Sequence, residues 1–147
     1  MLKRSPLKNA SPIYALMIDD SRSDISLMRR ALKKSKNSCF LMTAPDGSEA
    51  LRLLSACEVL PQLIILDLNM AGMTGLETLE ALKSDARYTH IPVVVFSSST
   101  FEEDVIKSYQ GHCSAFVRKP SDMSKLIPLV ERMCSFWFSV VEYVKPS

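Results

Sequence analysis

The chain has 147 residues, 47% of them apolar, which is enough for one domain with a single hydrophobic core. Its 18 basic and 16 acidic side chains are interspersed and leave a net charge of +2, which argues against direct nucleic-acid binding. No segment has the pattern of a signal peptide or a membrane-spanning helix, so we expect a cytoplasmic protein that does not bind membranes. Residues 1–12 are basic and contain proline, and they predict a disordered leader before a domain over 13–144.

Five short apolar runs alternate with segments of helical periodicity. The runs predict strands at Tyr14–Ile18, Phe40–Thr43, Leu63–Leu66, Val93–Phe96 and Ala115–Arg118. The third run is apolar throughout, which is typical of a strand buried on both faces in the middle of a parallel sheet. Strands that alternate with helices predict right-handed crossovers and a doubly wound α/β fold with five strands and five helices.

Residues that favour helix starts precede several of the predicted helices. Ser21 or Ser23 can cap the first helix, and Ser48 begins the second. Thr100 with Glu103 three residues later has the pattern of a capping box at the start of the fourth. The sequence therefore predicts the start of the fourth helix next to Thr100.

Four of the five predicted strands end at side chains that can bind or react. These are Asp19 and Asp20 after the first strand, Asp67 after the third, Ser97 after the fourth and Lys119 after the fifth. In a sheet of order 2-1-3-4-5 the ends of these four strands meet at one crevice, where ligands bind in such folds. Carboxylates that share a pocket repel one another unless a divalent cation or the lysine neutralises them. Oxygen ligands of this kind favour Mg²⁺.

These strand ends, taken with their flanking residues, resemble the receiver domain of two-component response regulators, as in the chemotaxis regulator. The matching segments are Ile18–Ser21, Leu66–Gly75, Pro92–Ser97 and Phe116–Pro120. The resemblance covers about residues 13–135 with the motifs in register. It implies a flavodoxin-like sheet of five parallel strands in the order 2-1-3-4-5.

The resemblance also implies the chemistry. Asp67 would be the nucleophile that takes a phosphoryl group from a phosphohistidine of a sensor histidine kinase. The chain would accept this group and could lose it again by autodephosphorylation, so it is not expected to be a classical enzyme. The cofactor would be Mg²⁺, held by Asp19, Asp20, Asp67 and the backbone carbonyl of Asn69.

Two further residues would contact the phosphoryl group, and one would respond to it. By the same resemblance, Lys119 would hold one phosphoryl oxygen and Ser97 would donate its hydroxyl to another. After phosphorylation Ser97 would move inward and Phe116 would rotate into the space, which makes these two residues the switch. The family also implies a cis bond between Lys119 and Pro120.

The C-terminal segment carries apolar residues in steps of three and four from Leu126 to Val144. This spacing is typical of a helix that packs against another helix, so we expect an extended C-terminal helix, kinked or restarted near Pro128. A frayed terminal helix or a short strand is the alternative. The favoured interpretation is a homodimer through the far end of this helix, with contacts at Trp137, Phe138, Val140 and Val141.

A narrower resemblance comes from the aromatic ending Phe136–Phe138 and the loop at Asn69–Met70. Both are similar to the single-domain regulators that partner bacterial phytochromes. This resemblance implies a phytochrome-type histidine kinase as phosphodonor.

Three functions from different classes remain open. A phosphorylated regulator that signals through protein contacts is favoured, because no segment is left for a DNA-binding helix-turn-helix. A receiver-shaped interaction module that is never phosphorylated is the alternative, although such a module typically lacks one of the acids or the lysine. A phosphohydrolase of the dehalogenase type would carry a second aspartate two positions after Asp67, where this sequence has Asn69.

Overall fold

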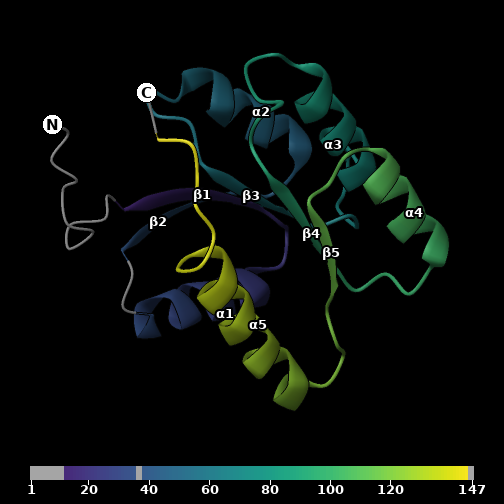
Figure 1. Cartoon of the computed structure of the whole chain (residues 1–147). Helices are drawn as coiled ribbons and strands as arrows, with labels where there is room; N and C mark the ends of the chain where they lie inside the picture. The colour runs from purple at the N-terminus through teal and green to yellow at the C-terminus, as the bar shows by residue number, and fades with distance from the viewer. Residues whose placement is uncertain (1–11, 36–37, 146–147) are drawn as a thin grey trace, which may run out of the picture.

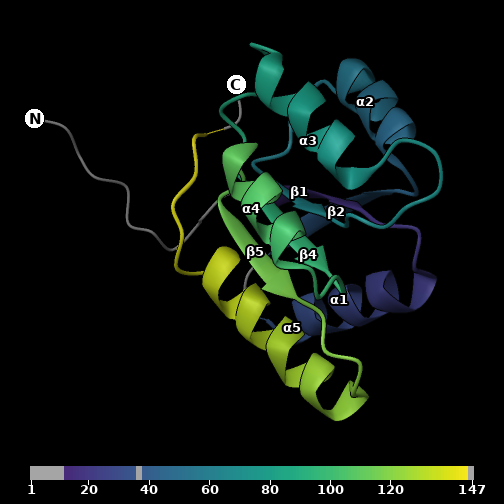
Figure 2. The ribbon, with the colours of Figure 1, turned by 90° about the vertical axis from the view of Figure 1, so that its right-hand side faces the viewer.

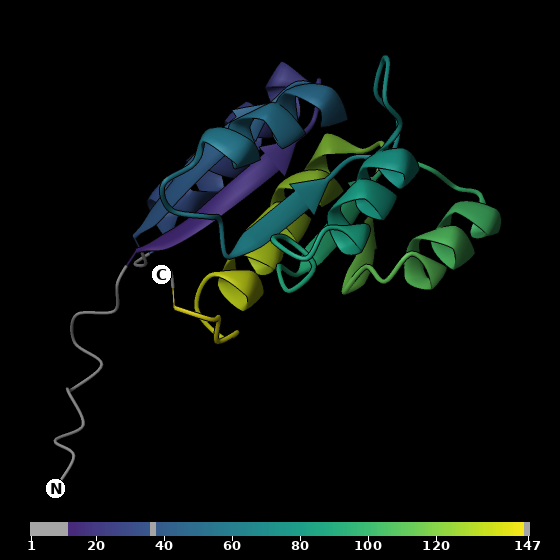
Figure 3. The ribbon, with the colours of Figure 1, turned by 90° about the horizontal axis from the view of Figure 1, so that it is seen from above.

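The computed structural model describes residues 12–35 and 38–145, so the predicted leader 1–12 lies outside the described residues except for its last position. A parallel five-stranded sheet has the order β2-β1-β3-β4-β5, which confirms the predicted topology. Figure 3 shows the arrows of β1 and β3 pointing the same way. The strands are β1 (Ile13–Ile18), β2 (Cys39–Ala44), β3 (Leu63–Leu66), β4 (Val93–Ser97) and β5 (Ala115–Arg118).

Helices cover both faces of the sheet. They are α1 (Arg22–Lys34), α2 (Gly47–Ala56), α3 (Gly75–Ser84), α4 (Glu102–Gln110) and α5 (Met123–Trp137). Helices α1 and α5 lie on one side, whereas α2, α3 and α4 lie on the other (Figures 1 and 2). Among the described residues, none of the helices is both long and apolar enough to cross a bilayer.

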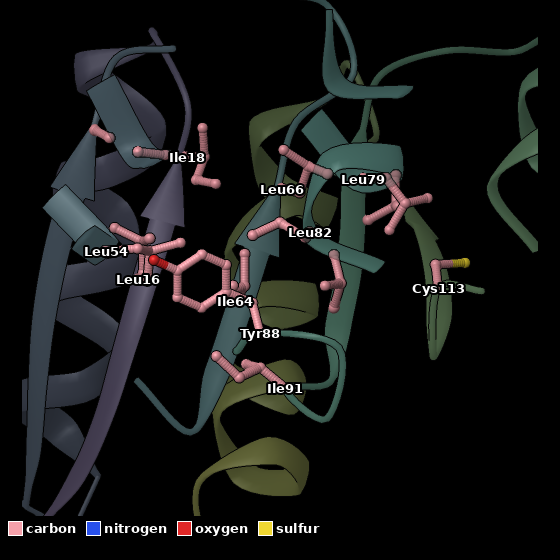
Figure 4. Close-up of a cluster of buried hydrophobic side chains, with 14 of the residues drawn as sticks. Leu16, Ile18, Leu54, Ile64, Leu66, Leu79, Leu82, Tyr88, Ile91 and Cys113 are labelled. Carbon is pink, nitrogen blue, oxygen red and sulfur yellow. The ribbon is translucent and has the colours of Figure 1, made fainter. Parts of the chain in front are cut away.

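The strands separate two hydrophobic cores because their successive side chains point to opposite faces. Leu16, Ile64 and Val95 pack with α2 and α3 on one face, and Figure 4 shows the first two beside Tyr88 in this core. Met17 and Ile65 pack with α1 and α5 on the other face. Strand β3 is buried along its whole length, as its uninterrupted apolar run predicts. Because the strand is packed on both faces, the position of Asp67 directly after it is fixed.

The predicted start of α1 is confirmed, but those of α2 and α4 are each off by one residue: α2 begins at Gly47 instead of Ser48, with Asp46 as its cap accepting a hydrogen bond from Glu49 N. The side chain of Ser21 accepts a hydrogen bond from Asp24 N at the start of α1. The predicted capping box at Thr100 is wrong, because α4 starts one residue later, with Phe101 in the cap position and no side-chain cap there. Instead, Ser99 Oγ accepts a hydrogen bond from Phe101 N at 3.3 Å and closes a serine turn just before the helix.

The extended C-terminal helix predicted to reach Val144 is also wrong, because α5 ends at Trp137. The carbonyls of its last two residues find partners in the segment that follows: Val140 N and Val141 N donate to Phe136 O, and the Tyr143 hydroxyl donates to Trp137 O at 2.6 Å. These bonds satisfy the groups that a continuing helix would have used. The chain then turns back along the sheet, as the yellow segment in Figure 1 shows.

The returning segment is tied to the amino end of the sheet. Gln62 accepts a hydrogen bond from Tyr14 N through Oε1 and donates one to Val144 O through Nε2 at 2.9 Å. Helix α5 itself runs unbroken past Pro128, so the predicted restart is absent. Pro128 and Ser124 are both exposed, so water can reach the Ser124 carbonyl that lacks its helical partner.

Candidate functional site

The backbone brings the predicted site residues to one edge of the sheet. Asp19 and Asp67 follow directly on β1 and β3, whose last residues pair with each other, and Asp67 N donates to Ile18 O at 2.9 Å. Lys119 follows β5, and its backbone N donates to Ser97 O at 2.8 Å. The carboxyl ends of the four strands therefore converge, as their predicted order requires.

Three carboxylates form a candidate metal centre at this edge. Asp19, Asp20 and Asp67 each offer an oxygen, and these oxygens lie within 4.8 Å of one another. Asp19 and Asp67 are buried, whereas Asp20 is exposed and leaves the cluster open to solvent. An oxygen-only donor set with an open side suits a hard divalent cation that keeps some of its waters. The residues present therefore fit a divalent metal ion.

Lys119 lies beside the carboxylates and is itself almost buried, with 9% of its side chain exposed. Its Nζ donates to Asp19 Oδ2 at 2.8 Å and lies 3.8 Å from Asp67 Oδ2. The ammonium is also 5.0 Å from the centre of the Phe96 ring, close enough for a cation–π contact. Lys119 is therefore held between the acids and the core, at the edge of the candidate metal centre.

A fourth acid, Asp24, completes this cluster and was not among the predicted site residues. Its Oδ2 accepts a hydrogen bond from Lys119 Nζ at 2.8 Å, across 95 positions in the sequence. Asp24 lies in the first turn of α1, where an acid is expected simply because it interacts well with the helix dipole. The only sequence signal was its place five residues after Asp19, which could not distinguish the two roles.

The titration properties reflect this crowding of charge. Burial raises the pKa of the Asp67 carboxyl to about 6; Lys119 opposes the rise and Asp19 adds to it. Burial also raises the pKa of Asp19 in spite of its hydrogen bond with Lys119. For Lys119, burial alone would lower the pKa, but the hydrogen bonds to Asp19 and Asp24 outweigh it and raise the pKa. A divalent cation would relieve the excess negative charge.

Ser97 is fully buried at the end of β4 and belongs to a short polar chain. Its Oγ accepts a hydrogen bond from Ser99 N at 3.2 Å and retains its own proton for donation. The Ser99 hydroxyl donates to Asp104 Oδ2, and Ser99 O accepts from Arg118 Nε at 3.1 Å. This chain joins the site to α4 and β5, a link that the sequence did not reveal.

The remaining predicted residues lie nearby. Asn69 N is 3.5 Å from Asp67 Oδ1, which is a long contact, and Phe116 is half-buried in β5 with its N donating to the Tyr109 hydroxyl. Gly75 starts α3 against the loop after β3, where a Cβ atom would lie 2.3 Å from Asp67 O. The implied cis Lys119–Pro120 bond is wrong, because no cis peptide bond occurs in the described residues.

The family model of the response regulator receiver domain matches residues 15–131 of this chain. Among curated proteins, response regulator Rcp1 of Synechocystis sp. is 33% identical over 135 residues, which cover 88% of this chain and 92% of Rcp1. The Mn²⁺-bound crystal structure of Rcp1 has a TM-score of 0.87 at 32% identity, covering 91% of this chain and 100% of that chain.

Two other solved structures share the fold and the level of identity. The phosphorylated cyanobacterial phytochrome response regulator RcpA has a TM-score of 0.86 at 33% identity, covering 92% of this chain and 100% of that chain. The bacteriophytochrome response regulator AtBRR has a TM-score of 0.67 at 30% identity, covering 90% and 99%. Together with the acids and the lysine at the strand ends, these matches show that the chain belongs to the response regulator receiver family.

Proposed function

We propose that Asp67 accepts a phosphoryl group from a phosphohistidine of a sensor histidine kinase, and that the modified chain signals through altered protein contacts. The observation that carries the proposal is the convergence of a buried carboxylate, two further acids and a buried ammonium at one edge of the sheet. The similarity to RcpA, whose crystal structure is of a phosphorylated form, supports it.

Asp67 is the nucleophile in this proposal. One of its carboxylate oxygens bonds to phosphorus while the bond from phosphorus to the donor's imidazole nitrogen breaks. The third N–H of Lys119 is available to a phosphoryl oxygen, and the Ser97 hydroxyl can donate to another. Both donors are buried and already placed, so little reorganisation is needed when charge develops on the phosphoryl group.

The metal ligands are proposed to be Asp19, Asp20, Asp67 and the backbone carbonyl of Asn69, with Mg²⁺ as the ion. When bound, Mg²⁺ neutralises charge that would otherwise repel the incoming phosphoryl group. The exposed Asp20 lets the ion enter with part of its hydration shell, which suits the reluctance of Mg²⁺ to lose water.

Ser97 and Phe116 are proposed as the switch. The half-buried Phe116 is two residues before Arg118, the register partner of Ser97 on β5, so the two side chains lie on adjacent strands. A movement of Ser97 toward a phosphoryl group would change the space beside Phe116 and displace the polar chain through Ser99 to α4. The outer surface of α4 and β5 would then carry the signal.

The phosphodonor is proposed to be a histidine kinase of the phytochrome type in the cytoplasm. RcpA and AtBRR are described as regulators of a phytochrome and a bacteriophytochrome, and both are at least 30% identical to this chain. An unphosphorylated interaction module of receiver shape is the alternative, and a labelling experiment distinguishes the two. The chain accepts a phosphoryl group and can hydrolyse it, rather than turning over substrate as a classical enzyme does.

Incubation with acetyl phosphate and Mg²⁺ is expected to add one phosphoryl group to the wild type and none to the Asp67→Asn variant, because an amide oxygen cannot form an acyl phosphate. Intact-protein mass spectrometry measures the addition. The control is Asp85→Asn, which removes a carboxylate that pairs with Arg87 on the surface and should leave labelling unchanged. Equal labelling of the Asp67→Asn variant and the wild type would refute the assignment.

We also propose that the chain forms a homodimer through the end of α5 and the segment that follows. Trp137, Val140 and Val141 remain as contacts, but Phe138 is buried within its own subunit and is not available. The exposed Phe136 takes its place, since 49% of it is accessible, as is 66% of Val140. Such a run of accessible apolar side chains is typical of an interface.

The dimer predicts a sedimentation coefficient that rises with protein concentration in the wild type. Phe136→Ser should shift this rise to higher concentrations, because it removes an exposed apolar contact. Phe40→Ser provides the matched control, since Phe40 is a phenylalanine of similar exposure, 56%, on β2 at another place on the surface. A wild type that stays monomeric at high concentration would exclude the dimer.

A further inference from the structure

Two hydrogen bonds fix the position of the Lys119 ammonium. An ammonium has three N–H donors, and two of them are used by Asp19 Oδ2 and Asp24 Oδ2, each at 2.8 Å. Asp67 Oδ2 is 3.8 Å away, too far for a hydrogen bond. One N–H therefore remains on the side of Asp67 without being bonded to it, where a phosphoryl group attached to Asp67 would lie.

Asp24 is held more firmly than an ordinary surface acid. It occupies the third position of α1, its backbone N donates to the cap residue Ser21, and only 18% of its side chain is exposed. Asp19 is fixed at the end of β1 by its backbone bond to Ala44 O. Two rigid elements thus hold the ammonium from two directions, which one carboxylate alone could not do.

Removal of the Asp24 carboxylate would free Lys119 to move. Its Nζ is 3.8 Å from Asp67 Oδ2, and a shift of about 1 Å would turn this separation into a direct charge-assisted hydrogen bond. Lys119 would then be hydrogen-bonded to the Asp67 carboxylate, whose oxygens have to bind the metal and attack the phosphorus. The nucleophile would have to break this new ion pair before it reacts.

We infer that Asp24 is a positioning residue for phosphoryl transfer: it keeps the Lys119 ammonium off Asp67 and aims its third N–H at the incoming phosphoryl group. The inference rests on the proposed function of Asp67 and extends it to a residue outside the strand ends. Asp24 acts chiefly through Lys119, because its carboxylate accepts a hydrogen bond from that ammonium, whereas its effect on Asp19 is a weaker charge repulsion.

The first test compares the rate of labelling by acetyl phosphate at saturating Mg²⁺. Asp24→Ala should slow labelling about tenfold, since a misplaced donor is a typical cause of a rate loss of this size. Asp24→Asn keeps an acceptor without the charge and should have an intermediate rate. The matched control is Glu49→Ala, which removes an acid from the same helical position of α2, where its carboxylate pairs with Arg52 and not with Lys119. A rate for Asp24→Ala equal to that of Glu49→Ala would overturn the inference.

The second test separates positioning from a general structural effect. In a Lys119→Met background there is no ammonium to position, so adding Asp24→Ala should change the labelling rate by less than about twofold. If Asp24→Ala slows labelling tenfold in that background as well, Asp24 does not act through Lys119 and the inference is wrong.

A third measurement does not depend on phosphorylation. The Lys119 ammonium protons, bonded to the buried Asp19 and the half-buried Asp24, should exchange slowly enough with water to give a resolved ¹H–¹⁵N signal in the wild type. Asp24→Ala should remove the signal and Glu49→Ala should retain it. A signal unchanged by Asp24→Ala contradicts the inference. If the wild type is never labelled at Asp67 while this signal behaves as expected, the proposed function fails and the placement of Lys119 by Asp24 stands.

Discussion

The Asp67→Asn variant is expected to be more stable than the wild type by about 3 kcal/mol at pH 7 in the absence of metal. The reason is that the folded state holds the Asp67 carboxyl at a pKa of about 6, compared with an ordinary value of 3.8, because the group is buried. Each unit of such a shift corresponds to about 1.4 kcal/mol. The amide has no charge to bury and avoids this cost.

The pH dependence follows from the sign of the shift. A raised pKa means that the folded state binds the proton more tightly than the unfolded state, so the free energy of unfolding falls as pH rises. The loss begins near the unfolded pKa of 3.8 and is complete above the folded value of about 6. The advantage of Asp67→Asn should therefore be absent below pH 4 and full at pH 7.

Urea unfolding in EDTA at pH 4 and pH 7 measures the effect. Asp20→Asn is the control, because Asp20 belongs to the same cluster but is exposed and its charge costs little. Addition of a divalent cation should stabilise the wild type more than the Asp67→Asn variant, since binding only to the folded state favours that state. If Asp67→Asn is less stable than the wild type at pH 7 without metal, the buried charge is not the cost that the structure indicates.

The sheet and most of the site could be predicted because short-range patterns determine them. A run such as Leu63–Leu66 is too apolar for an edge strand, and the acids at the ends of two runs mark the same edge once the strands are parallel. Asp24 could not be predicted in the same way. Its contact spans 95 positions and depends on where α1 packs, while locally it resembles any acid in a first helical turn.

The start of α4 and the end of α5 were mispredicted for related reasons. Thr100 and Glu103 have the spacing of a capping box, but Ser99 competes by bonding Phe101 N and Asp104, so the chain turns one residue later. In α5 the apolar spacing is real, but it serves the core of the same subunit, because Val130 and Met133 are buried against the sheet and α1. A periodic apolar stripe does not reveal whether its partner is in the same chain or in another.

Because α5 ends at Trp137, Phe138 is expected to contribute to the stability of the monomer and not to a dimer contact. It follows the last residue of α5, is only 2% exposed, and packs in the core formed with Met28 and Cys134. Phe138→Ala is expected to lower the free energy of unfolding by about 3–5 kcal/mol, because it leaves a cavity where an aromatic ring was buried. As a dimer contact, Phe138 would instead affect association and leave the stability of the monomer nearly unchanged.

Chemical denaturation at low protein concentration distinguishes these roles, with Phe136→Ala as the matched control. Phe136 precedes Phe138 by two residues and is 49% exposed, so the same substitution should cost less than about 1 kcal/mol in the monomer. The two variants should then differ in opposite ways: Phe138→Ala in monomer stability, Phe136→Ala in the concentration dependence of sedimentation. If Phe138→Ala costs no more than Phe136→Ala, the chain after Trp137 does not pack on the core, and the extended helix regains support.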